Sequence, residues 1–209
     1  MSPIKNKKTQ GDASALPQER IVNSKKIYRN SLIDSIRDTL ATSLRSLGFP
    51  CRTEVRLPGT ELVPADIFIP TLAEDSPTAV DVSVVHPLQP SHSAQATVSA
   101  GMAAEARAVS KVAMYGAKCS ARSWAYTAFV ADTTGSWNQA AQRLVGKLAR
   151  VHSLRTGEVE LASSLWLVLA RALAQTVGKQ LVRARSQDEA EVAPLNVVDQ
   201  GGAPIAVAY

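Results

Sequence analysis

Two short segments of this chain are apolar at almost every position, yet each contains a single aspartate. Residues 65–69 read Ala-Asp-Ile-Phe-Ile, and residues 79–85 read Ala-Val-Asp-Val-Ser-Val-Val. Segments that are apolar on both faces are typical of strands at the centre of a covered sheet. They place Asp66 and Asp81 where a carboxylate loses its hydration, which is unfavourable unless the charge finds a partner.

The segments around these two strands predict an α/β fold. Alternation predicts a first strand over residues 52–57 and a fourth over residues 124–131. Apolar residues at helical spacing predict helices over residues 31–47, 93–118, 136–151 and 159–185. The predicted core is therefore helix, three strands, helix and strand, with two added C-terminal helices and a mixed central sheet of about four strands flanked by helices. The early strands can pair as hairpins or a meander, whereas the fourth, reached through a helical crossover, is expected to lie parallel to a neighbour.

The surplus of positive charge lies at the N-terminal end. The chain has 23 Lys and Arg against 18 Asp and Glu, and residues 1–29 hold seven basic and two acidic side chains. The remaining residues hold 16 of each sign, so the whole net charge of +5 belongs to this end. We predict a basic disordered arm over residues 1–30, a folded domain over 31–185 and a loose tail over 186–209. The side chains expected to bind nucleic acid non-specifically are Lys5, Lys7, Lys8, Lys25, Lys26 and Arg29.

Cysteine content and hydropathy indicate an intracellular protein of the nucleus or cytoplasm. Two cysteines are too few for a disulfide scaffold, and the first thirty residues lack the apolar segment of a secretory signal. The most apolar run, residues 165–174, is about half as long as a membrane span and contains Arg171, so no membrane contact is expected. The apolar last helix is expected either to cover the sheet or to pair with a second chain as a homodimer.

The two strand acids are the candidate metal ligands. If Asp66 and Asp81 lie on neighbouring strands and share a face, a divalent cation would offset their mutual repulsion. The alternative is two unrelated carboxylates, each satisfied by its own partners. Glu54, inside the first strand, is a possible third ligand, although the alternation of its strand is equally compatible with a side chain that faces water.

A basic face of the long second helix is the other candidate feature. Lys111 and Tyr115 are about one turn apart and share a face, which Arg107 and Lys118 complete. A lysine directed at two strand carboxylates would stabilise a phosphate or polarise a water molecule. A solvated basic face without a function explains the same spacing.

Several short motifs, taken in order, resemble one known domain family. They are Arg37-Asp38, Leu47-Gly48-Phe49, Glu54, Pro64-Ala65-Asp66-Ile67, Val80-Asp81-Val82-Ser83-Val84-Val85-His86-Pro87-Leu88, Lys111 to Tyr115, and Thr134-Gly135-Ser136-Trp137. Together with the order of elements, this succession resembles the PD-(D/E)XK restriction-endonuclease-like fold. It resembles most closely the module found C-terminal in retrotransposon-type reverse transcriptase polyproteins. The resemblance covers roughly residues 31–185.

The resemblance implies a metal-dependent DNA endonuclease. It assigns Asp66 and Asp81 as catalytic ligands of Mg²⁺ or Mn²⁺ and Glu54 as a possible helper. Ser83 stands where the motif has its lysine, and the resemblance implies that Lys111, with Tyr115, supplies that function from the following helix. The alternative is a catalytically inactive nuclease-fold module that binds nucleic acid or a protein partner.

Overall fold

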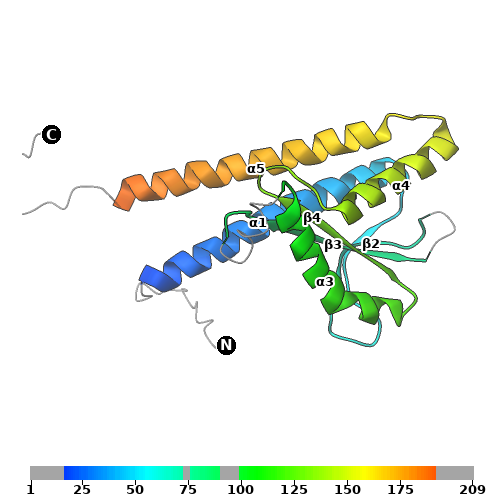
Figure 1. The fold of residues 1–209 in the computed structure, drawn as a ribbon, viewed down its shortest axis with the longest axis horizontal. Coiled ribbons are helices and arrows are strands. Elements are labelled where there is room, and N and C mark those ends of the chain that lie inside the picture. The colour runs from blue at the N-terminus through cyan, green and yellow to red at the C-terminus, as the bar shows by residue number, and fades with distance from the viewer. Residues whose placement is uncertain (1–16, 73–75, 90–98, 192–209) are drawn as a thin grey trace, which may run out of the picture.

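Four strands form one mixed sheet in a computed structural model of the chain (Figure 1). The structure describes residues 17–72, 76–89 and 99–191, with side chains described from residue 31 to 186 within these ranges. The strands are β1 (Arg52–Val55), β2 (Ala65–Ile69), β3 (Thr78–Val85) and β4 (Ala125–Asp132), arranged side by side in this order. β2 pairs antiparallel with β1 and with β3, whereas β4 is parallel to β3. The predicted fold class and the parallel fourth strand are confirmed.

Helices cover both faces of the sheet (Figure 1). They are α1 (Pro17–Ser46), α3 (Met102–Ser120), α4 (Gln139–Thr156) and α5 (Leu161–Glu191). The larger core joins one face of the sheet to α1, α4 and α5, and the opposite face packs against α3. β2 and β3 are thus interior strands between two helical layers, as their apolar sequences predict.

The helices on the two faces contribute side chains of different size. The larger core is built from alternate strand residues and the apolar stripes of three helices, among them Ile67, Ile69, Val80, Val82, Phe129, Ile36, Leu40, Leu148 and Leu169. On the opposite face α3 contributes three buried alanines, Ala103, Ala104 and Ala108. Alanines let a helix lie close to a sheet, so long polar side chains of α3 can reach strand residues near its axis.

The structure corrects the predicted ends of several helices. α1 begins at Pro17, so the second half of the segment expected to be a disordered arm is helical. Proline suits the first turn of a helix, and no glycine or proline follows it before residue 47, which explains the longer helix. α5 continues to Glu191, past the expected start of the loose tail. α3 begins at Met102, and residues 90–98 lie outside the described part.

The predicted nucleic-acid arm is not tested by the fold. Lys5, Lys7 and Lys8 lie outside the described residues, and so do the side chains of Lys25, Lys26 and Arg29. Their assignment stays a prediction.

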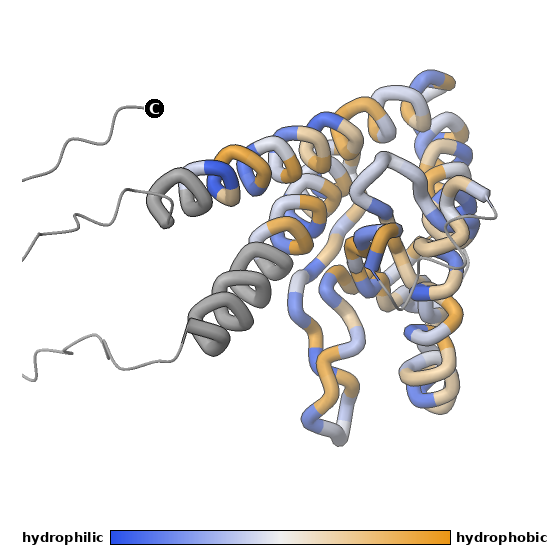
Figure 2. Tube along the Cα trace, turned by 60° about the vertical axis from the view of Figure 1, so that its left-hand side comes forward, coloured by the Kyte–Doolittle hydropathy of each residue, from blue (hydrophilic) through white to orange (hydrophobic). Residues whose placement is uncertain are grey.

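The last helix, α5, is strongly apolar and packs along α1 through one face. Leu165, Leu169 and Leu173 are buried, whereas Leu167 and Leu181 are exposed. Hydrophobic and hydrophilic stretches alternate along it (Figure 2). Within the described residues α5 is the one helix long and apolar enough to cross a membrane, over Leu161–Ser186, a property that core helices of soluble proteins share. The predicted homodimer through this helix and the absence of membrane contact stay predictions.

Candidate active site

The two strand acids lie at the end of the β2–β3 ladder. Its last pair is Ile67 with Val80, and Asp66 and Asp81 are the next residues of the two strands. Asp81 belongs to the α3 side of the sheet, because Lys111 of α3 contacts it. In β2, Ala65 and Phe68 both pack in the cluster that includes Cys119 of α3, whereas Ile67 packs in the larger core, so the regular alternation of β2 breaks at Asp66.

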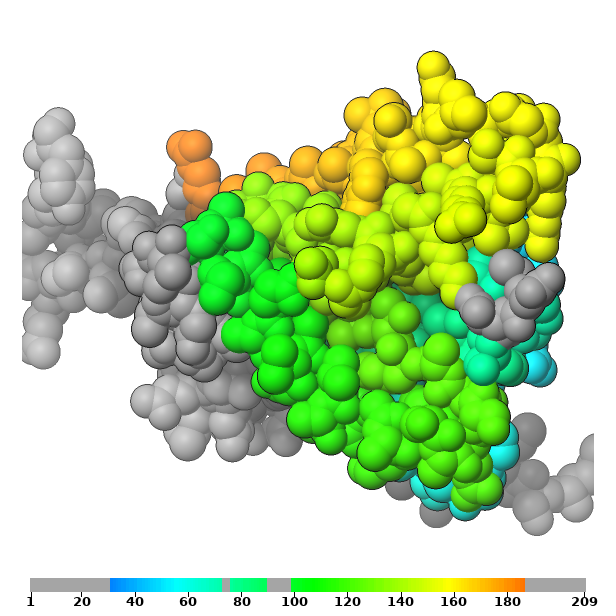
Figure 3. Space-filling view, turned by 45° about the vertical axis from the view of Figure 1, so that its right-hand side comes forward, coloured from blue at the N-terminus to red at the C-terminus, as the bar shows by residue number. Residues whose placement is uncertain are grey.

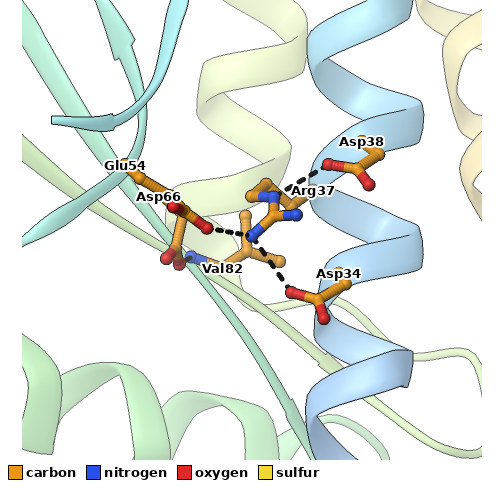
Figure 4. A network of polar contacts seen from close by, with 6 residues as sticks. All are labelled: Asp34, Arg37, Asp38, Glu54, Asp66 and Val82. Carbon is orange, nitrogen blue, oxygen red and sulfur yellow. Dashed lines mark hydrogen bonds and ion pairs between the residues drawn. The ribbon is translucent and has the colours of Figure 1, made fainter. Parts of the chain in front are cut away.

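Asp66 lies where β2 and β3 separate, and its carboxylate contacts the backbone of β3. The Val82 backbone N–H donates to Asp66 Oδ2 at 2.6 Å (Figure 4). Burial, and after it the negative charge of Asp81, raise the pKa of Asp66 from its ordinary value to about 6. The Val82 hydrogen bond and the positive charges of Lys111 and Arg37 oppose this rise in pKa. Asp66 is therefore a carboxylate that gains from any additional positive charge placed beside it.

Asp81 is buried and holds the lysine that the helical spacing predicted. Its two carboxylate oxygens lie 3.0 Å and 2.9 Å from Lys111 Nζ, and the Tyr126 hydroxyl donates to Oδ2 at 3.1 Å. The side chains of Asp81 and Lys111 are only 7% and 15% exposed, so the ion pair is poorly hydrated. Burial first, and then the charge of Asp81, raise the pKa of the Tyr126 phenol, which keeps it a proton donor at neutral pH.

Tyr115 lies beside the Asp81–Lys111 ion pair. It has no described polar contact to Asp66 or to Asp81. Its ring lies 5.5 Å from Lys111 Nζ and 6.0 Å from the ring of Tyr126. Lys118 Nζ lies 5.9 Å from the same ring, on the next turn of α3. The structure therefore brings Asp66, Asp81 and Lys111 together and places Tyr115 one layer farther out, as the partner of Lys111.

Glu54 is engaged elsewhere. The β1–β2 register sets it opposite Asp66, but its backbone has a positive φ of 53°, which breaks the regular alternation of β1. Its Oε1 lies 2.8 Å from Arg37 Nη1 of α1 (Figure 4). No group of three His, Cys, Asp or Glu side chains close enough to hold a metal ion occurs among the described residues. Where a third metal ligand was expected, the structure thus has a carboxylate paired with a guanidinium.

Arg37 is the centre of this second polar network. Besides Glu54 it contacts Asp34 Oδ1 at 3.0 Å and Asp38 Oδ1 at 2.8 Å, while its own side chain is 16% exposed. The hydrogen bond to Asp38, together with the surrounding carboxylates, raises the pKa of Arg37. The network fixes the edge of β1 to α1 beside Asp66.

The donor set at the site fits a hard divalent cation. Mg²⁺ is commonly held by one or two carboxylates, completed by water and by phosphate oxygens of the substrate. Asp66 and Asp81 provide two neighbouring carboxylates, and the pKa of Asp66 is raised partly by the charge of Asp81, an effect that a cation between them would reverse. Ser83, two residues after Asp81 on β3, is buried and contributes an uncharged hydroxyl on the same face.

Two buried polar residues that the sequence did not single out have structural roles. Asp132 Oδ1 accepts hydrogen bonds from the backbone N–H groups of Thr134 and Ser136, which closes the turn after β4. Asn138 caps α4 by accepting from Ala141 N–H and also bonds to the backbone of β4. Tyr126 is the site residue that was missed, because its proximity to Asp81 depends on the β3–β4 register.

No protein-family model matches this chain, and the comparison with curated proteins gave no match. The function of the site is therefore inferred from its geometry and chemistry.

Proposed function

We propose that this protein is a Mg²⁺- or Mn²⁺-dependent DNA endonuclease that hydrolyses or nicks a phosphodiester bond. The observation that carries the proposal is the closeness of Asp66 and Asp81 at the end of the β2–β3 ladder, with Lys111 of α3 against Asp81. Neighbouring carboxylates with a perturbed pKa and a lysine from a second element are typical of catalytic sites. The resemblance to the PD-(D/E)XK module of retrotransposon-type reverse transcriptase polyproteins supports this proposal. We further propose that the chain derives from a retroelement and acts inside the cell.

The residues divide the chemistry between them. A bound divalent cation would activate a water molecule and offset negative charge on the scissile phosphate. Asp66 and Asp81 would hold that cation through their oxygens. Lys111, whose ammonium group lies at Asp81, would stabilise the negative charge that develops on the phosphate oxygens. This role explains how Ser83 can replace the lysine of the motif, because α3 supplies the positive charge.

Two tyrosines act as positioning residues. Tyr126 donates to Asp81 Oδ2 and so fixes the rotamer of the carboxylate. Tyr115 places its ring beside the Lys111 ammonium group, a cation–π contact that limits the positions the lysine can adopt. Neither tyrosine needs to ionise for these roles.

One observation favours the alternative of a catalytically inactive module. Lys111 and Tyr126 already satisfy both oxygens of Asp81, so this carboxylate has partners without a metal ion. A module of this kind would bind nucleic acid or a protein partner without hydrolysing a bond. The two functions differ in their response to metal, because only the nuclease needs Asp66 and Asp81 to accept a cation.

Conversion of supercoiled plasmid to the relaxed form tests the proposal. With Mg²⁺ or Mn²⁺ present, Asp81→Asn is expected to reduce nicking by about 100-fold or more, the scale of losing one electrostatic contact to a transition state. Asp38→Asn is the matched control, since this α1 carboxylate is exposed and pairs with Arg37. Equal nicking by the wild type and Asp81→Asn would refute the assignment. No nicking by the wild type over the full range of both metals would select the inactive module.

A further inference from the structure

One side of α3 carries a row of basic residues that extends in both directions from Lys111, the lysine of the candidate site. Arg107, Lys111 and Lys118 are about one and two turns apart, which places them on the same side of the helix. Tyr115 lies between the two lysines. We call these four residues the basic flank. α3 lies open along its length at the molecular surface, as the green helix of Figure 3 shows.

Two of the three basic residues in the basic flank have no described carboxylate partner. Lys111 is paired with Asp81, but neither Arg107 nor Lys118 has an acidic partner within the described ranges. The one acid of α3, Glu105, accepts a hydrogen bond from the backbone N–H of Gln139 instead. The flank is therefore complementary to a polyanion, even though residues 30–209 are neutral as a whole.

Tyr115 adds an aromatic surface to this charge. Its ring lies between two ammonium groups, 5.5 Å from Lys111 Nζ and 5.9 Å from Lys118 Nζ. Proteins that bind single-stranded nucleic acid combine basic side chains along the backbone with aromatic rings on which bases stack. A duplex keeps its bases stacked inside, so it would use the lysines and leave the ring without a base.

We propose that the basic flank binds single-stranded DNA and leads the strand to Asp66 and Asp81. The inference rests on the proposed function, because it names the form of DNA that this site receives. Arg107 and Lys118 are separated by about 16 Å along the helix axis. A DNA strand carries one phosphate per about 3.4 Å of duplex axis, so the flank is long enough to contact several nucleotides. Lys111, between these ends, is the point at which the strand meets the carboxylates.

Fluorescence anisotropy of a labelled single-stranded oligonucleotide, with the full chain in EDTA, measures binding without cleavage. The double variant Arg107→Ala/Lys118→Ala is expected to bind about 10-fold more weakly at low salt. Its plot of log affinity against log salt should be shallower by about 1.4, since each phosphate contact on a single strand contributes about 0.7. The charge-matched control is Arg150→Ala/Arg171→Ala, two exposed residues of α4 and α5, which should change affinity less than about twofold.

The aromatic contact has its own pair of variants. Tyr115→Ala is expected to weaken binding by about 5- to 150-fold, the effect of losing one stacked base. Tyr115→Phe keeps the ring and should bind as the wild type does. Thermal unfolding of each variant establishes that the comparison is between folded proteins.

The inference is overturned if both double variants lose affinity equally, if Tyr115→Ala binds like the wild type, or if a duplex of the same length binds more tightly. Cleavage separates this inference from the proposed function. A wild type that nicks plasmid while the Arg107→Ala/Lys118→Ala variant keeps full affinity refutes the basic flank alone. A wild type that does not nick, but whose affinity depends on the flank and Tyr115, refutes the nuclease and supports the strand-binding surface.

Discussion

Two ion-pair clusters stand on either side of Asp66, and they differ in their contact with water. On the α1 side Arg37 meets Asp34, Asp38 and Glu54, whose side chains are 50%, 63% and 66% exposed. On the α3 side Lys111 meets Asp81 with 15% and 7% exposed. Hydrated pairs contribute little free energy, whereas a buried charge requires its partner. The comparison indicates that the α1 cluster joins elements at little cost in desolvation, whereas the α3 pair depends on both of its partners.

Removal of one cation from each cluster should give the largest contrast. Lys111→Met leaves Asp81 buried with a single hydrogen-bond donor, and we expect a loss of about 3–5 kcal/mol in the free energy of unfolding. Arg37→Met leaves carboxylates that water can solvate, so a loss of about 1 kcal/mol is expected. Urea denaturation at neutral pH measures both values. A larger loss for Arg37→Met would reverse the comparison.

Asp66 should make the wild type less stable as pH rises. Its pKa is about 6 in the folded chain, above the ordinary value of 3.8, so the folded state binds more protons between these values. Stability is then lost as pH increases from about 4 to about 6. Asp66→Asn, whose side-chain oxygen still accepts from Val82 N–H, should be more stable than the wild type by up to about 3 kcal/mol at pH 7.5.

The pH series contains its own control for Asp66. The difference between Asp66→Asn and the wild type should disappear below pH 4, where both side chains are neutral. A difference in the free energy of unfolding that stays constant across pH, or a variant less stable than the wild type at pH 7.5, would show that ionised Asp66 does not destabilise the folded state.

The sequence predicted those features that depend on the residue pattern within a single strand or helix. Two apolar segments located the interior strands and their aspartates, and helical spacing set Lys111 and Tyr115 on one side of α3, from which Lys111 reaches Asp81. The relation between strands was not predictable, because alternation fixes the face within one strand and says nothing of register. Tyr126 reaches Asp81 through the β3–β4 register, which sets Ala128 opposite Asp81.

Local backbone geometry explains the remaining differences. Glu54 adopts a left-handed conformation that carries its carboxylate to Arg37, and no residue type in Thr53-Glu54-Val55 signals this. α1 begins before Ser31 because charged and polar residues obscure the helical pattern of a segment that lacks helix-breaking residues.

Loss of the Tyr126 hydroxyl should have an intermediate effect. Tyr126→Phe removes the hydrogen bond to Asp81 Oδ2 and keeps the ring against Tyr115. A buried hydrogen bond to a charged group contributes about 1.5–3 kcal/mol, and we expect a loss near the lower value because Lys111 remains. Thermal unfolding detects the change, and Tyr115→Phe is the control. Equal stability of Tyr126→Phe and the wild type would remove Tyr126 from the site.

The smallest effect is expected at Glu54. Glu54→Gln should change the free energy of unfolding by less than about 0.5 kcal/mol, because its carboxylate is largely exposed beside a guanidinium that retains two other acids. The same variant should nick plasmid at the wild-type rate. A loss of nicking comparable to that of Asp81→Asn would place Glu54 among the metal ligands after all.

The most direct test of the central claim is a titration with Mn²⁺ followed by electron paramagnetic resonance, which counts bound ions. Joint action of Asp66 and Asp81 on a cation predicts saturable binding by the wild type, loss of binding in Asp66→Asn, and tighter binding in Lys111→Met, where no ammonium group competes for Asp81. Equal Mn²⁺ binding by the wild type and Asp66→Asn, or none by either Lys111→Met or the wild type, would contradict it.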